Sequence, residues 1–206
     1  MLKADLITAL QDTRSELWHD ESNPAEPGYE ADLEGQWLAA VCRQHRANFE
    51  LWHIEDEARR PGATDAEMAE VKRRVDRTNQ RRNDLAEKLD LFLLAHLEPF
   101  GLPDPTAELH SESPGLMIDR LSILALKIFH TREETLRSDV DHEHVERNEA
   151  RLRILLEQRR DLANCLDRLW EQVGRCKRRF KLYRQLKMYN DPSLNPAVYR
   201  DLQAKI

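Results

Sequence analysis

The 206-residue chain has few of the residues that build sheets and tight loops. It contains 6 glycines and 6% aromatic residues, whereas 34% of its residues are charged. Such a composition is typical of long helices with a solvated face and unlike that of a β-sandwich. No apolar run approaches the roughly 20 residues that a membrane-spanning helix requires, and the first residues open a mixed helix rather than a signal peptide. We therefore expect an all-α protein without a membrane span.

Several chemical signatures are also missing. The three cysteines, Cys42, Cys165 and Cys176, form no C-x-x-C pair. An odd number of unpaired cysteines fits a reducing compartment, so we expect a cytoplasmic location. The sequence lacks a glycine-rich phosphate loop, a G-x-S-x-G nucleophile elbow and the Cys/His spacing of zinc fingers. The sequence motifs therefore indicate no required cofactor and no class of reaction. They do not decide whether the protein is an enzyme.

An internal repeat is the most informative feature that is present. Residues 49–57 resemble residues 126–134, and residues 82–90 resemble residues 159–167. One and the same shift along the chain, the shift that carries His53 onto His130, relates both pairs of segments. Each repeat therefore contains two segments with helical periodicity. This pattern predicts two related antiparallel hairpins that form a four-helix bundle.

Helix boundary signals divide the chain accordingly. Pro61-Gly62 breaks the first hairpin, and Thr64 with Glu67 forms a capping box after it. Ser113 followed by Pro114 is an N-cap with proline at the first helical position. We expect one domain over residues 1–206, with a first helix over 2–18, hairpin one over about 32–97, hairpin two over about 114–189, and a basic C-terminal extension over 175–206.

The C-terminal extension differs in charge from the rest of the chain. It carries nine Lys and Arg residues against two Asp residues, although the whole chain has a formal net charge of −6. Such a segment can dock on an acidic body or attract an anionic partner. Because a basic helix end also complements the helix dipole, we consider nucleic-acid binding the weaker interpretation.

Two arginines interrupt the apolar stripes of the hairpins at equivalent positions, Arg82 and Arg159. A buried, unpaired arginine is very costly, so each requires a carboxylate, a ligand or water. Counting residues from the hairpin turns places Asp119 near the level of both. Our leading hypothesis is that this cluster keeps residual positive charge and binds an anionic small molecule, such as a sugar phosphate or nucleotide sugar. The alternative is a closed ion-pair network.

The candidate residues for this site fall into two groups. The ligand-binding candidates are Arg82, Arg159, Asp119, Asn79, Asn83, Asp84, Ser122 and Lys127. The acid/base candidates are His53, His130 and Asp119.

A divalent-metal-dependent hydrolase is a further alternative. The motifs His53-x-x-Asp56 and His130-x-x-Glu133 each place two types of metal ligand one helical turn apart. When positions are counted from each hairpin turn, the other acidic residues lie far along the helices from these histidines. This argues against a metal site. Structural histidines beside aromatic side chains such as Trp52 are then the simpler interpretation.

Longer motifs resemble a known family. They include Asn48-Phe49-x-Leu51-Trp52-His53-x-Glu55-Asp56-x-Ala58-Arg59 and Tyr183-Arg184-Gln185-x-Lys187-Met188-Tyr189-Asn190-Asp191-Pro192. Over most of its length the chain resembles the bacterial domain-of-unknown-function family 4254. The resemblance implies a small helical bacterial protein associated with the glycosyltransferases of envelope polysaccharide synthesis. It therefore adds the hypothesis of a non-catalytic adaptor that binds a glycosyltransferase or a second copy of itself, and it supplies no catalytic residues.

Overall fold

The computed structural model describes residues 3–20, 29, 32–186 and 193–196. The predicted all-α class is confirmed. The helices are α1 (Ala4–His19), α2 (Leu33–Glu57), α3 (Asp65–Leu97), α4 (Pro114–Thr135) and α5 (His142–Gly174), with a 3-10 turn η1 (Glu98–Phe100) and two short strands, β1 (Glu108–Leu109) and β2 (Arg178–Arg179). None of these helices has the length and apolarity that crossing a membrane requires.

The predicted helix starts are confirmed by their capping bonds. The Thr64 hydroxyl accepts a hydrogen bond from the Glu67 backbone while the Glu67 carboxylate accepts one from the Thr64 backbone, which completes the capping box. The Ser113 hydroxyl accepts from the backbone of Leu116 at the start of α4. These bonds satisfy N–H groups that the first helical turn leaves without partners.

The predicted end of the last long helix is wrong. Helix α5 ends at Gly174 rather than continuing towards residue 189. Cys176 has a left-handed φ of 55°, and the chain then extends as β2, which pairs in parallel with β1. Phe180 follows and is only 3% exposed within the core. Burial of this ring and pairing with β1 favour a chain reversal that helical propensity does not reveal.

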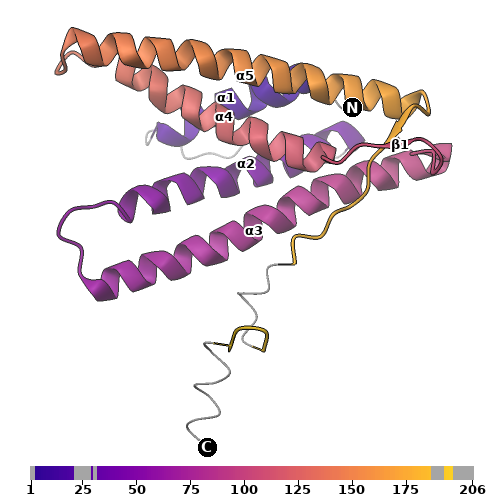
Figure 1. Cartoon of the computed structure of the whole chain (residues 1–206), viewed down its shortest axis with the longest axis horizontal. Coiled ribbons are helices and arrows are strands. Elements are labelled where there is room, and N and C mark those ends of the chain that lie inside the picture. The colour runs from indigo at the N-terminus through magenta and orange to yellow at the C-terminus, as the bar shows by residue number, and fades with distance from the viewer. Residues whose placement is uncertain (1–2, 21–28, 30–31, 187–192, 197–206) are drawn as a thin grey trace, which may run out of the picture.

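The helices form two antiparallel hairpins, α2–α3 and α4–α5, whose turns lie at the same end of the molecule, on the left in Figure 1. Helix α4 contacts all four other helices, whereas α1 contacts α2, α4 and α5. Helix α1 therefore fills the space between the hairpins and belongs to the core. Helices α1, α2 and α4 all run towards the end that carries the hairpin turns.

Each repeat anchors a neighbouring helix in the same way. On α3, the Asp90 carboxylate accepts a hydrogen bond of 2.7 Å from the backbone N of Gly115, in the first turn of α4. On α5, its equivalent Asp167 accepts one of 2.9 Å from the backbone N of Ala4, the first residue of α1. A carboxylate is favourable at a helix N-terminus. The anchoring of α1 on α5 therefore corresponds to the anchoring of α4 on α3.

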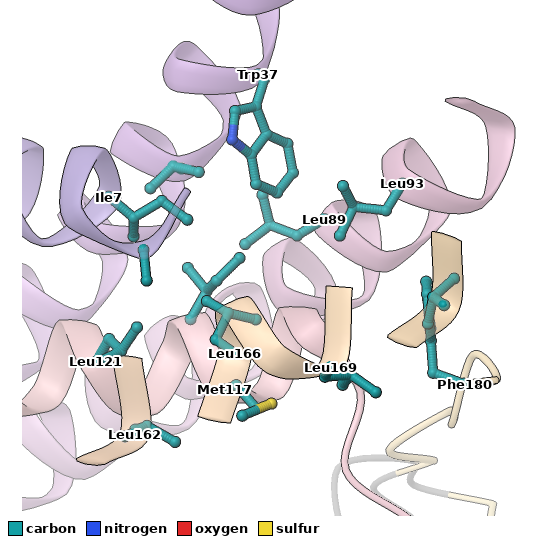
Figure 2. Packing of buried hydrophobic residues seen from close by; sticks show 14 of the residues in the cluster. Ile7, Trp37, Leu89, Leu93, Met117, Leu121, Leu162, Leu166, Leu169 and Phe180 are labelled. Carbon is teal, nitrogen blue, oxygen red and sulfur yellow. The ribbon is translucent and has the colours of Figure 1, made fainter. Parts of the chain in front are cut away.

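The core lies where the helices converge (Figure 2). Helix α4 buries eleven of its 22 residues, most of them apolar. Its Met117 and Leu121 pack in one cluster with Ile7 of α1, Trp37 of α2 and Leu166 of α5. Because all five helices contribute, the core fixes how the two hairpins sit relative to each other.

Candidate functional site

A buried polar network surrounds Asp119 on α4. Arg82 of α3 forms a two-pronged ion pair with its carboxylate, with a Nε–Oδ1 distance of 2.8 Å and a second bond from a terminal guanidinium nitrogen. Gln44 and Asn48 of α2 donate to the same carboxylate at 2.6 and 3.0 Å. Asp119 is 6% exposed. The arginine that the sequence predicts to be drawn inward is therefore matched by a carboxylate, as a buried charge requires.

The network continues through Ser122 and His45. The Ser122 hydroxyl lies 2.9 Å from the amide nitrogen of Asn48 and 2.7 Å from Nδ1 of His45. Nε2 of His45 lies 3.1 Å from the hydroxyl of Ser15 on α1. Burial lowers the pKa of His45 to about 3, so the ring is neutral. Since His45 and Ser122 are both fully buried, this serine–histidine pair is a structural link between α1, α2 and α4.

The predicted cluster of two arginines around Asp119 is wrong in one half. Arg159 of α5 instead pairs with Asp12 of α1 at 2.5 Å. The prediction counts residues from the hairpin turns and so compares only the four hairpin helices. Helix α1 lies against α5 and supplies the carboxylate of Asp12 instead. Each arginine therefore pairs with the helix anchored on its own long helix, Arg82 with α4 and Arg159 with α1.

The other ligand-binding candidates are dispersed. Asn79 and Asn83 lie half-buried on α3 and make no hydrogen bond with Asp119 among the described residues. Asp84 is exposed and accepts a hydrogen bond from Gln80. Lys127 is exposed on α4. Of these candidates, the structure joins only Arg82, Asp119 and Ser122 in one network of described residues.

Three histidines meet near the ends of α1, α2 and α4. One ring nitrogen from each of His19, His53 and His130 lies within 4.8 Å of those of the other two. The Nε2 atoms of all three are buried and have no hydrogen-bond partner among the described residues. Buried polar atoms are rarely left without a partner. A shared metal ion would satisfy all three at once, and imidazole is the commonest protein ligand of zinc and similar metals.

Two of the three rings are oriented from their other nitrogen. Nδ1 of His19 lies 2.6 Å from the backbone oxygen of Ser15, and Nδ1 of His130 lies 2.9 Å from the Glu133 carboxylate. Both acceptors place the proton on Nδ1 and leave the lone pair on Nε2. This second layer of carbonyl and carboxylate partners is the usual support of metal-binding histidines.

Aromatic side chains pack around the three rings. His130 stacks on Trp52 with 4.8 Å between ring centroids, and His19 stacks on Phe129 with 4.1 Å. In a tetrahedral zinc site the ligand nitrogens lie about 3.3 Å apart, given Zn–N bonds of about 2 Å. Small rotations of the side chains would therefore close the cluster around an ion.

The repeat explains why the histidines reach the same level. His19 lies as far along α1 from Ala4 as His130 lies along α4 from Gly115, and Ala4 and Gly115 are the two residues that the equivalent aspartates anchor. In both helices the separation is about four turns, or about 22 Å. His53 is the repeat equivalent of His130 and lies on α2, which runs in the same direction.

The charge state of the cluster suits metal binding. Burial, followed by repulsion from His19 and His130, lowers the pKa of His53. Burial likewise lowers the pKa of His130, although its hydrogen bond with Glu133 acts in the opposite direction. The carboxylate of Asp56 lies close enough to act electrostatically on both rings. At neutral pH His53 and His130 are therefore uncharged, which is the form of imidazole that binds metals.

Trp52 lines two cavities. The first, of about 470 Å³, is lined by Asp56, Arg82 and Asn48 together with apolar residues of α2 and α4. The second, of about 410 Å³, is lined by His130 itself, Lys127 and Arg151. Both volumes suit small molecules.

Comparison with known proteins identifies the family. The family model described as "Protein of unknown function (DUF4254)" matches residues 38–182. The chain belongs to this family. No curated protein and no solved structure matches the chain. Of the three histidines in this DUF4254 protein, His53 and His130 lie inside the matched segment and His19 lies before it.

The sequence motifs of this DUF4254 chain indicate two of the three histidines. His53 and His130 stand out through the repeat, but His19 lies outside it. Comparing positions on the two helices of one hairpin does not find the cluster, because the three histidines come from different hairpins and from α1. Of the other two predicted metal ligands, Glu133 bonds with Nδ1 of His130, and Asp56 acts electrostatically on His53 and His130.

Two residues of the Asp119 network have no signal in the sequence. Gln44 and His45 lie on α2, and their partners on α4 are 75 and 77 residues away in the chain. No local motif therefore indicates that either residue is buried in a polar network.

Proposed function

We propose that this protein binds a divalent transition metal, zinc or a similar ion, through His19, His53 and His130 and uses it for hydrolysis. The observation that carries the proposal is the meeting of three histidines, one ring nitrogen of each within 4.8 Å of those of the others, whose buried Nε2 atoms have no hydrogen-bond partner among the described residues. A centre with three histidine ligands leaves a coordination position for water, and zinc in such a centre lowers the pKa of that water to about 7.

Asp56 is the residue that we assign as general base. Its carboxylate acts on two of the three rings and also lines the 470 Å³ cavity. A substrate in this cavity would therefore lie beside a proton acceptor that acts on two of the proposed metal ligands. In the proposed reaction, water loses a proton to Asp56 and adds to the ester or phosphoester centre. The bond to the leaving group then breaks, and the leaving group takes up that proton.

Metal content tests the first half of the proposal. We expect about one zinc ion per chain in untagged protein by elemental analysis, and a tight site by titration of metal-free protein with Zn²⁺. His53→Ala and His130→Ala should lose this binding, whereas His142→Ala should keep it because His142 is 85% exposed elsewhere. Circular dichroism checks that the variants fold. If wild-type protein holds no metal and Zn²⁺ leaves its melting temperature unchanged, there is no metal centre.

Asp56→Asn tests the second half. We expect this variant to bind Zn²⁺ like the wild type but to hydrolyse p-nitrophenyl phosphate or p-nitrophenyl acetate at least 100-fold more slowly, in keeping with the usual effect of a general base. Equal rates in the variant and the wild type would remove Asp56 from the mechanism. The adaptor role, the link to polysaccharide synthesis and the cytoplasmic location stay predictions.

A further inference from the structure

The 410 Å³ cavity beside His130 brings together two basic side chains that form no ion pair with any described residue. Residues of α4 and α5 line it together with Trp52 of α2. Elsewhere, many arginines and lysines pair with a neighbouring carboxylate, as Arg81 does with Glu50 and Arg74 with Glu57. Two cations in this cavity have no such partner among the residues that the structure describes.

Lys127 and Arg151 are these two cations. Lys127 forms no ion pair with any described residue and lines both this cavity and a neighbouring one of about 690 Å³. Arg151 donates to the side-chain oxygen of Asn148 at 2.8 Å and has no carboxylate partner in the described part of the chain. Asn148 is 4% exposed and in turn donates to the backbone oxygen of His144. The buried amide therefore holds the guanidinium in place.

The carboxylate in the cavity does not cancel these charges. Glu134 accepts bonds of 3.0 Å from Arg137 and 2.8 Å from His144. It is the one carboxylate among the described lining residues of this cavity and stands against two cations. The lining therefore carries an excess of positive charge. The remaining walls, Trp52 and Leu155, are largely apolar.

We propose that this cavity binds a small molecule with a phosphate-like anionic group and an apolar or ring-shaped group. The anion would lie between Lys127 and Arg151, and the ring would lie against Trp52 and Leu155. Arginine and lysine are the usual partners of phosphate groups, and an aromatic side chain such as Trp52 offers apolar surface to a ring-shaped group beside the stacked His130. The site replaces the predicted pair Arg82 and Arg159, whose charges are matched by Asp119 and Asp12.

Contact with His130 relates the cavity to the metal centre. As a site next to the metal centre, the cavity rests on the proposed function, because His130 is then a ligand of the ion. As an anion site, it stands independently, because no contact of Lys127, Arg151 or Asn148 requires a metal.

Calorimetric titration of metal-free protein with phenyl phosphate, inorganic phosphate and phenol tests the proposal. We expect saturable binding of phenyl phosphate, weaker binding of phosphate and no binding of phenol. Lys127→Met and Arg151→Gln should each weaken phenyl phosphate binding about tenfold, the effect of removing one charge-assisted contact. Arg132→Gln on α4 and Arg153→Gln on α5 remove exposed charges outside this cavity and should leave the affinity unchanged.

The outcomes of this titration separate the two proposals. Equal weakening by all four substitutions would show a general charge effect and overturn the site, as would the absence of saturable binding. Phosphate binding as tightly as phenyl phosphate would remove Trp52 from the site. Failure of Zn²⁺ binding in the same preparations overturns only the metal centre, since this titration is done without metal.

Discussion

Acid sensitivity of the fold is the sharpest consequence of the buried network. His45 is fully buried between Ser15 and Ser122, and burial lowers its pKa to about 3. In the unfolded chain the pKa of histidine is about 6.5. Below pH 6.5 the unfolded chain therefore binds a proton that the folded chain does not, so stability is lost as pH falls from about 6.5 towards 3.

The magnitude follows from the size of the pKa difference. Each pH unit within this window costs about 1.4 kcal/mol, so lowering the pH from 8 to 5 should remove about 2 kcal/mol of unfolding free energy through His45 alone. His53 and His130, whose pKa values are also lowered, add to the total loss. To isolate the contribution of His45, the unfolding free energy must be compared between two proteins that both contain His53 and His130.

His45→Gln provides that difference. Glutamine can bond with both serines but does not titrate. Urea unfolding in the presence of a chelator, followed by circular dichroism between pH 8 and 5, should show that the advantage of the wild type over the variant shrinks by about 2 kcal/mol. His142→Gln is the matched control and should run parallel to the wild type, since His142 is 85% exposed. Parallel curves for His45→Gln as well would refute the reasoning.

Two further substitutions test the packing of the fold. A Cβ atom added at Gly115 would lie 2.3 Å from the backbone oxygen of Ala86, so Gly115→Ala should separate α3 from α4 and lower the free energy of urea unfolding by about 3 kcal/mol. The control Gly174→Ala should not destabilise the protein, because nothing lies within 4 Å of the added atom. If Gly115→Ala is tolerated, the close contact between the helices is contradicted. Phe180 is 3% exposed, so Phe180→Ala should lower the free energy of unfolding by about 3–5 kcal/mol. Phe100→Ala should change it little, because this ring is 70% exposed. Equal effects would show that the segment after α5 does not belong to the core.

The parts of the fold that sequence patterns predict are those with local causes. The capping box at Thr64, the serine cap at Ser113 and the apolar character of α4 act within a few residues, and each is present. The end of α5 depends on β2 pairing with β1, and both α4 and α5 lie between these two strands in the chain. No local pattern contains that information.

The same distinction applies to the site. Arg82 and Asp119 pair as predicted because both lie on stripes that face the inside of the bundle. The place of α1 depends on a contact between Ala4 and Asp167, which are 163 residues apart. Without α1, neither the partner of Arg159 nor the third histidine can be found.

Because the three histidines lie far apart in the chain, the proposed metal ion would link separate parts of the molecule. A cut in the connector between α3 and α4 would leave His19 and His53 on one fragment and His130 on the other. Reassembly of the fragments would then be favoured by the affinity for the metal as well as by the apolar interface, because an ion bound only by the assembled state stabilises that state. Zinc concentration would in that way set how firmly the two halves of the molecule hold together.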